Sequence, residues 1–149
     1  MTCKHGPTEC IGDVLILCAA NLPFPSEPSG RTPTVRYLGF ANCLLSSYER
    51  IPEREFIEHC ALEHGLDFDS LNRCASSEDD DKNGGLALLR ESARRNDALA
   101  VEKSCTVRVN ERVWCVRDDG VWKECEGNAS KAVLVEEINR LWREKNHLT

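Results

Sequence analysis

The segment from residue 3 to residue 18 carries the densest set of groups that could do chemistry. It reads CKHGPTECIGDVLILC and contains three cysteines, a histidine and a glutamate. A thiolate is the nucleophile of thiol–disulfide exchange, and a helix N-terminus or a neighbouring imidazole activates a thiol. Cys3 and His5, beside a helix start, have both ingredients for a redox role. We favour the alternative that Cys3 and Cys10 belong to a disulfide framework, because a dithiol reductase needs a resolving cysteine beside the attacking one.

An amphipathic helix must position these groups. Proline is favoured in the first helical turn and acidic side chains suit its N-terminus, so Pro7 and Glu9 indicate a helix start. Apolar residues then recur at three- and four-residue spacing and predict one buried stripe. On such a helix Cys10 and Cys18 are separated by roughly 12 Å of rise, beyond the roughly 7 Å between Cα atoms that a disulfide allows. Each therefore needs another partner, and Cys3 could fold back onto Cys10 or reach another segment.

The spacing of these groups resembles a family signature. The chain reads CxHGxxEC followed by a further cysteine, which resembles the signature of the gamma-interferon-inducible lysosomal thiol reductase (GILT) family. The family usually has glutamine and asparagine where this chain has Lys4 and Asp13. The signature residues are Cys3, His5, Gly6, Glu9, Cys10 and Cys18, and further likeness lies at residues 40–43, 60, 74, 95–99 and 107–110.

This resemblance implies a thioredoxin-like oxidoreductase that reduces disulfides of protein substrates through a mixed disulfide, with a small thiol or dithiol as reductant. Family members carry a catalytic CxxC ahead of the signature, and no CxxC occurs in these 149 residues. We therefore expect an α/β, thioredoxin-like fold with a large helical insertion that lacks its N-terminal βαβ part, and no catalytic residue in this chain. The alternative is a non-enzymatic, disulfide-stabilised secreted binding or structural protein.

The same likeness singles out a candidate substrate loop. Ser104, Cys105 and Thr106 stand where thioredoxin-like reductases carry the cis-proline loop that faces the CxxC. Cys105 replaces that proline, so the family's mode of substrate binding is open here, and a thiol at this place could react or bind a metal. A cysteine that merely begins a strand is the interpretation we favour.

The rest of the chain is predicted to be helices followed by a hairpin. A loop rich in proline and glycine spans residues 23–33, and apolar spacing predicts helices within 34–47, 51–65, 69–75 and 86–99. After residue 104, alternation around a turn at Asn110 predicts an antiparallel hairpin, and Ser130 or Asn128 caps a last helix. We treat 1–149 as one domain, with the helical insertion at 34–100 and the hairpin plus terminal helix at 104–145. The residues of the last helix expected to face inward are Ala132, Val133, Leu134, Ile138, Leu141 and Trp142.

Nine cysteines in this length indicate an oxidising compartment. Cys60 and Cys74 lie on consecutive predicted helices, so a disulfide between them is the leading interpretation, with two buried thiols as a nearly equal alternative. Cys115 and Cys125 flank a turn, and we favour a disulfide there that closes a small loop.

An N-glycosylation sequon begins at Asn128. With the cysteine content and the family likeness, it predicts the secretory pathway, the lysosome or vacuole, or the extracellular space. Nothing after Met1 resembles a signal peptide. A lost N-terminal part would reconcile these two observations.

Composition argues against several other classes of function. The formal net charge of −6 disfavours binding to nucleic acid or to anionic membranes. No apolar run reaches the roughly 18 residues of a membrane span. A structural zinc site normally shows two short ligand pairs such as CxxC, so no metal or other cofactor is expected. The acidic run at residues 78–81 lacks the alternating ligands of a calcium loop and predicts a solvated turn.

Overall fold

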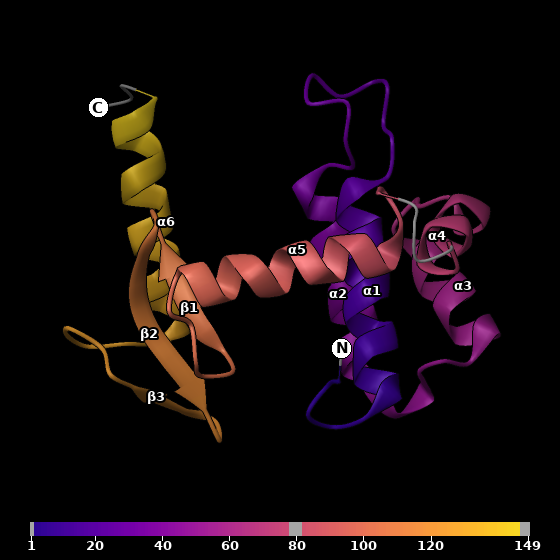
Figure 1. Cartoon of the computed structure of the whole chain (residues 1–149). Coiled ribbons are helices and arrows are strands. Elements are labelled where there is room, and N and C mark those ends of the chain that lie inside the picture. Colours follow the sequence, from indigo (N-terminus) through magenta and orange to yellow (C-terminus); the bar gives the residue numbers. More distant parts are fainter. Residues whose placement is uncertain (1, 78–81, 147–149) are drawn as a thin grey trace. The chain divides into compact units, whose positions relative to one another are not determined.

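The computed structural model describes residues 2–77 and 82–146, and in these residues six α-helices accompany one three-stranded antiparallel sheet (Figure 1). The solvated turn expected at residues 78–81 lies outside the described residues. The chain divides into two compact units, Met1–Arg95 and Asn96–Thr149, and each is described by itself. The prediction of a mostly helical chain is confirmed, whereas the thioredoxin-like assignment stays a prediction.

Five helices begin in the first unit, and local signals explain several of their ends. Gly6 precedes the first helix with φ 96°, a left-handed conformation that favours glycine, and Pro7 occupies the first helical position. Asp67 caps the fourth helix, since its carboxylate accepts a hydrogen bond of 2.8 Å from the Ser70 N–H. The helices are α1 (Pro7–Asn21), α2 (Thr34–Ser46), α3 (Arg54–Glu63), α4 (Phe68–Ala75) and α5 (Gly85–Ala98), with a short 3₁₀ turn, η1 (Tyr48–Arg50).

The hydrophobic core of this unit lies between α1, α2, α3 and α4. Helix α1 packs against α2 and α4, and α2 also packs against α3. Phe40 of α2 and Leu71 of α4 are fully buried, as is Cys18 of α1. Burial of each large apolar side chain stabilises the fold by roughly 1.5–3 kcal/mol. The core residues are Val14, Leu15, Cys18, Ala19, Leu22, Phe40, Leu44, Ile51, Phe56, Ile57, Cys60, Ala61, Leu66, Leu71 and Leu89.

The start of α5 is fixed against α1 and α4 by the absence of a side chain at Gly85. A Cβ atom there would lie 2.4 Å from Cγ1 of Val14 and 3.1 Å from the carbonyl oxygen of Cys74. Any larger residue would therefore force these helices apart. Glycine at this position brings the first turn of α5 close to both neighbours.

The second unit contains a meander of three short strands in the order β1-β2-β3. The expected hairpin is thus one strand short, because the turn at Asp119 and Gly120 leads into a third strand of three residues. Both residues of that turn have positive φ, as do Asn110 and Glu111 in the turn before it, which suits tight hairpin connections. The strands are β1 (Thr106–Val109), β2 (Arg112–Asp118) and β3 (Val121–Lys123).

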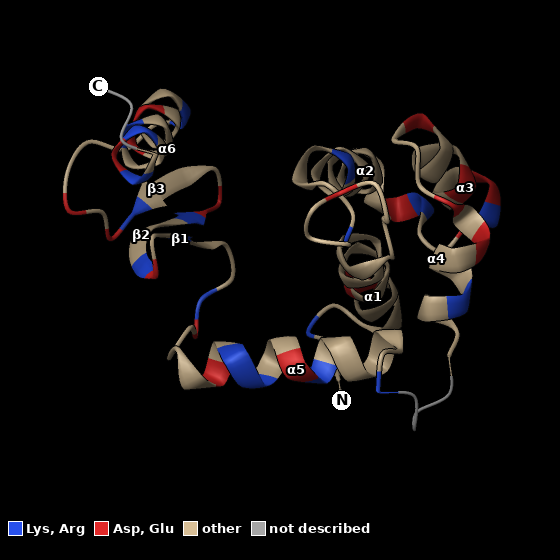
Figure 2. Cartoon of the chain, turned by 90° about the horizontal axis from the view of Figure 1, so that it is seen from above, with Lys and Arg blue, Asp and Glu red and all other residues tan. Residues whose placement is uncertain are grey.

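The last helix, α6 (Lys131–Lys145), runs beside this sheet in both overall views (Figures 1 and 2). Ser130 caps it, because its Oγ accepts a 3.2 Å hydrogen bond from the Val133 N–H. The predicted inward apolar face is covered only in part, since Val133, Leu134 and Leu141 are half-buried whereas the side chains of Ile138 and Trp142 are 49% and 57% exposed. The sheet is too small to cover all of this face, because only Cys115 and Val116 of its strands are buried.

Among the described residues, no helix combines the length and the apolar character needed to cross a membrane.

Candidate functional site

A disulfide joins Cys3 to Cys10 at the beginning of α1, with 5.6 Å between their Cα atoms. The entering loop folds back, and the Gly6 N–H donates a 3.2 Å hydrogen bond to the Cys3 carbonyl oxygen. Both cysteines are half-buried. The sequence left open whether Cys3 pairs with Cys10 or with another segment, and the structure shows the pairing with Cys10.

His5 and Glu9 of the signature contact one another across the same helix start. Oε2 of Glu9 accepts a 2.8 Å hydrogen bond from the His5 backbone N–H, and Oε1 of Glu9 lies 3.0 Å from Nδ1 of His5. Glu9 is the third helical residue, so this contact resembles a capping box shifted by one position. The backbone hydrogen bond, and then the imidazole contact, hold the pKa of Glu9 below its ordinary value. The pair secures the helix entrance.

Asp13 lies one helical turn beyond Glu9. Partial removal from water raises the pKa of Asp13, and the negative charge of Glu9 raises it further. The two carboxyl groups on one helix therefore have pKa values shifted in opposite directions. At neutral pH the charge on Asp13 therefore destabilises the folded state, whereas the charge on Glu9 strengthens its hydrogen bonds to His5 and stabilises it.

Two further disulfides tie the helices of the first unit in pairs. Cys18 of α1 is joined to Cys74 of α4, and Cys43 of α2 is joined to Cys60 of α3, with Cα separations of 5.9 and 5.7 Å. The expected disulfide between Cys60 and Cys74 is therefore wrong. Although their helices follow one another in the chain, α4 packs chiefly against α1 and α3 against α2. Each cysteine thus meets a helix that lies earlier in the sequence.

Cys43, like Cys18, is a disulfide partner that sequence reasoning left unassigned. It lies within the predicted helix 34–47 and packs, half-buried, against the core to which Cys18 of α1 belongs. Four cysteines on four predicted helices signal core cross-links, but the pattern alone does not say which helices touch.

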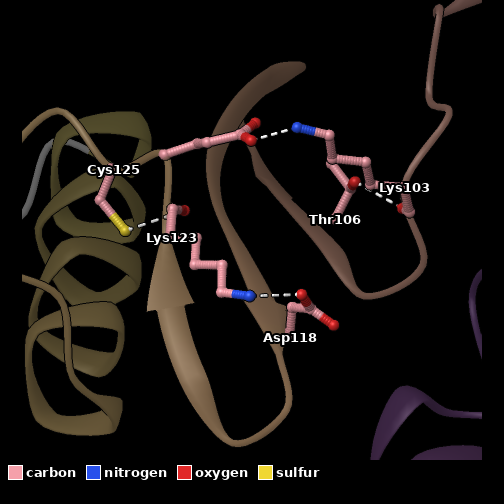
Figure 3. Close-up of polar contacts among 6 residues, drawn as sticks. Lys103, Thr106, Asp118, Lys123 and Cys125 are labelled. Carbon is pink, nitrogen blue, oxygen red and sulfur yellow. Dashed lines mark hydrogen bonds and ion pairs between the residues drawn. The ribbon is translucent and has the colours of Figure 1, made fainter.

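In the second unit a disulfide joins Cys115 of β2 to Cys125, just beyond β3, which is the pairing favoured from the sequence. Cys115 is 1% exposed. Sγ of Cys125 lies 3.4 Å from the Lys123 carbonyl oxygen, and Nζ of Lys123 donates a 2.6 Å hydrogen bond to Asp118 (Figure 3). The disulfide therefore lies beside a strand pair that side chains also connect.

The candidate substrate loop enters β1 in the same unit. Oγ1 of Thr106 donates a 2.7 Å hydrogen bond to the Lys103 carbonyl oxygen, and Nζ of Lys103 pairs with the carboxylate of Glu124 (Figure 3). Cys105 is an exposed free thiol with φ 57°, and its carbonyl oxygen accepts a 3.0 Å hydrogen bond from the Arg117 N–H. These contacts are those of a residue that begins a strand. Ser104 is exposed in the turn before it.

Most cysteines of the chain are therefore oxidised to disulfides. Eight of the nine cysteines are paired, and Cys105 belongs to a different unit from the signature. The signature residues contribute the His5–Glu9 contact at the start of α1, the disulfide Cys3–Cys10 and the Cys18 half of a second disulfide. Within residues 2–77 and 82–146, no group of three histidine, cysteine or acidic side chains is placed to hold a metal ion.

Residues 1–64 match the family described as gamma interferon inducible lysosomal thiol reductase (GILT). This segment of the chain is therefore similar to the GILT family. GILT-like protein 1 of Drosophila melanogaster is 29% identical over 94 residues, which cover 61% of this chain and 36% of that protein. The chain thus spans little more than a third of the length of this relative. No solved structure matches the chain.

The GILT segment coincides with α1, α2 and α3 of the first unit. It includes both halves of the disulfides Cys3–Cys10 and Cys43–Cys60, but only Cys18 of the third. Cys74, on α4, lies beyond the match. A disulfide therefore joins α4, which lies outside the matched residues, to α1, which lies within them.

Proposed function

We propose that this chain is the scaffold part of a GILT-type oxidoreductase that reduces disulfides of protein substrates. The observation that supports this proposal is the GILT match over residues 1–64, which contains the signature residues at the start of α1. In such a reaction one thiolate attacks the substrate disulfide, forms a mixed disulfide and releases one substrate thiol. A second thiol then attacks the mixed disulfide, releases the other substrate thiol and leaves an enzyme disulfide, which an external thiol or dithiol reduces again.

This reaction needs two neighbouring thiols, and we propose that neither comes from this chain. The signature cysteines are occupied in disulfides, one of which has its Cys18 half buried in the core. Cys105 is a free thiol, but it has no vicinal cysteine in the sequence, which contains no CxxC. We propose that the signature instead stabilises the scaffold beside which the two reacting thiols would lie.

The purified chain should therefore not accelerate the reduction of insulin by dithiothreitol. The matched variant Cys105→Ser should behave like the wild-type chain, because a lone thiol cannot resolve a mixed disulfide within one molecule. Turnover well above the dithiothreitol background would contradict the placing of the exchanging pair outside this chain. Retention of that turnover in Cys105→Ser would assign it to one of the disulfides.

The genomic sequence upstream of Met1 tests the enzymatic proposal itself. An in-frame CxxC preceded by a signal peptide would support the GILT-type reductase. An in-frame stop codon with no CxxC beyond it would favour the second candidate, a non-enzymatic secreted protein. Four disulfides that leave no vicinal thiols favour that candidate, since they describe a stabilised scaffold.

We also propose a secretory or lysosomal location with a glycan at Asn128. The supporting observations are the four disulfides, which persist in oxidising compartments, and the exposure of the sequon. Expressed with a secretion signal, the chain should lose mass on treatment with peptide N-glycosidase, and Asn128→Gln should not. An unchanged mass for the wild-type chain would refute glycosylation at this site.

A further inference from the structure

A cavity of about 900 Å³ opens in the first unit, away from the signature. Its walls are the C-terminal end of α1, α4, α5 and the chain at Pro23 and Arg31. A volume of this size is typical of sites for small organic molecules. None of the family's signature residues lines it. The lining residues are Leu17, Asn21, Leu22, Pro23, Arg31, Ser70, Arg73, Cys74, Lys82, Asn83, Leu88, Glu91, Ser92 and Arg95.

Cationic side chains outnumber acidic ones among the described residues that line this cavity. Among the described residues that line it, Arg31, Arg73 and Lys82 are cationic and Glu91 is acidic, although the formal net charge of the whole chain is −6. Basic bands of α5, which forms one wall, are visible in Figure 2. Cationic side chains that converge on a concave surface raise the local concentration of anions. Arginine also matches carboxylate and phosphate groups with two parallel hydrogen bonds.

One of these arginines is already oriented. Nη2 of Arg73 donates a 2.8 Å hydrogen bond to Oγ of Ser70, one turn earlier on α4, and both residues line the cavity. Because this hydrogen bond already restricts the side chain of Arg73, binding of an anion costs less side-chain entropy.

The cavity also has an apolar part and a rigid frame. Leu17, Leu22 and Leu88 line it, so a ligand with an apolar body as well as a charge would fill it. Cys74 lines it too, and its disulfide to Cys18 connects the α1 and α4 walls. The close approach of Gly85 to both helices fixes the α5 wall.

We propose that this cavity binds a small organic anion. Arg31, Arg73 and Lys82 hold its carboxylate or phosphate group, and the three leucines contact its apolar body. This site is separate from the proposed thiol–disulfide chemistry and does not depend on it.

Isothermal titration of the wild-type chain at low salt with two probes tests the proposal. Phenyl phosphate and benzoate share an apolar ring and differ in their anionic group, so preference for one identifies the chemistry of the natural ligand. Phenol, which lacks the charge, and inorganic phosphate, which lacks the ring, should bind more weakly. Higher salt should weaken the binding of either probe. Failure of both charged probes to bind at millimolar concentration would overturn the proposal.

Variants of two arginines locate the binding. Arg73→Gln should weaken the preferred probe by about tenfold, the loss expected for one charge-assisted hydrogen bond. Arg94→Gln is the matched control, because Arg94 is exposed on α5 but does not line the cavity. Equal binding by both variants would show that the anion binds elsewhere. Circular dichroism spectra of both variants should match the wild-type spectrum, which shows that a loss of affinity does not result from unfolding.

Discussion

The two units of this chain are stabilised in different ways. The first has a core to which five helices contribute and contains three of the four disulfides, including one that joins residues 56 positions apart. The second has two buried strand residues, Cys115 and Val116, and one disulfide across a separation of 10 residues. The first unit thus depends on contacts between distant parts of the sequence, and the second on local turns and caps. The family signature lies in the first unit, which long-range contacts stabilise.

The largest expected effect comes from the core of the first unit. Phe40→Ala removes a fully buried ring from α2 and should lower the free energy of unfolding by about 3–5 kcal/mol. Trp142→Ala, on the exposed face of α6, should cost less than about 1 kcal/mol because surface substitutions seldom cost more. Urea unfolding followed by circular dichroism measures both. A similar cost for the two variants would mean that α6 is covered in solution.

The disulfide between Cys18 and Cys74 should contribute nearly as much. The double variant Cys18→Ala/Cys74→Ala should lose about 4 kcal/mol on chain-entropy reasoning, because a long loop is no longer closed. The matched variant Cys3→Ala/Cys10→Ala opens a short loop and should lose about 2.5 kcal/mol. Both are measured by denaturant unfolding without reductant. The reverse order would contradict the view that long-range cross-links stabilise the first unit.

A smaller effect is expected at the cap of α6 in the second unit. Ser130→Ala removes the acceptor for the Val133 N–H and should cost about 1 kcal/mol. It also destroys the sequon, so Asn128→Gln serves as the control that removes the sequon and keeps the cap. Ser130→Thr should preserve both. In unglycosylated protein, thermal unfolding should separate Ser130→Ala from the other two, and a loss in Asn128→Gln of the same size would refute the role of the cap.

The smallest effects are dependences on pH at the start of α1. The pKa of Glu9 is lowered from 4.5 on folding, so its contribution is present above that value and is lost as pH falls through its lowered pKa. The pKa of Asp13 is raised from 3.8, so its charge disfavours the folded state above the raised value and not below 3.8. At pH 7, Glu9→Gln should therefore destabilise the chain and Asp13→Asn should stabilise it.

As the pH falls, the difference for Asp13→Asn should fade through the raised pKa of Asp13, and the difference for Glu9→Gln should fade through the lowered pKa of Glu9. Thermal unfolding of the variants and the wild-type chain between pH 3 and 7 measures them. Shifts of the same sign in the two variants would contradict the opposite environments of these carboxyl groups.

The features of the fold that the sequence predicted correctly are those that depend on residues close together in the chain. The starts of α1 and α6 follow from Pro7 and Ser130, and the hairpin turn follows from Asn110, because each acts within a few residues. The strand β3 escaped prediction because three residues carry too little alternation to detect.

The errors concern which distant surfaces meet. Cys60 was assigned to Cys74 because their helices are consecutive, whereas packing brings each against an earlier helix. The inward face of α6 was inferred from a correct helical period, but no sufficiently large partner surface covers all of it. The basic cavity could not be predicted at all, since residues between 17 and 95 converge on it only after folding. In the candidate site, the signature was recognisable from the sequence, but its contacts at the start of α1 required coordinates.

Mapping the disulfides of the oxidised chain by non-reducing proteolysis and mass spectrometry tests the central claim most directly. We predict linked peptides for Cys3–Cys10, Cys18–Cys74, Cys43–Cys60 and Cys115–Cys125, with Cys105 alone labelled by iodoacetamide before reduction. A peptide linking Cys60 to Cys74, or iodoacetamide labelling of Cys3 and Cys10 in the native chain, would contradict it.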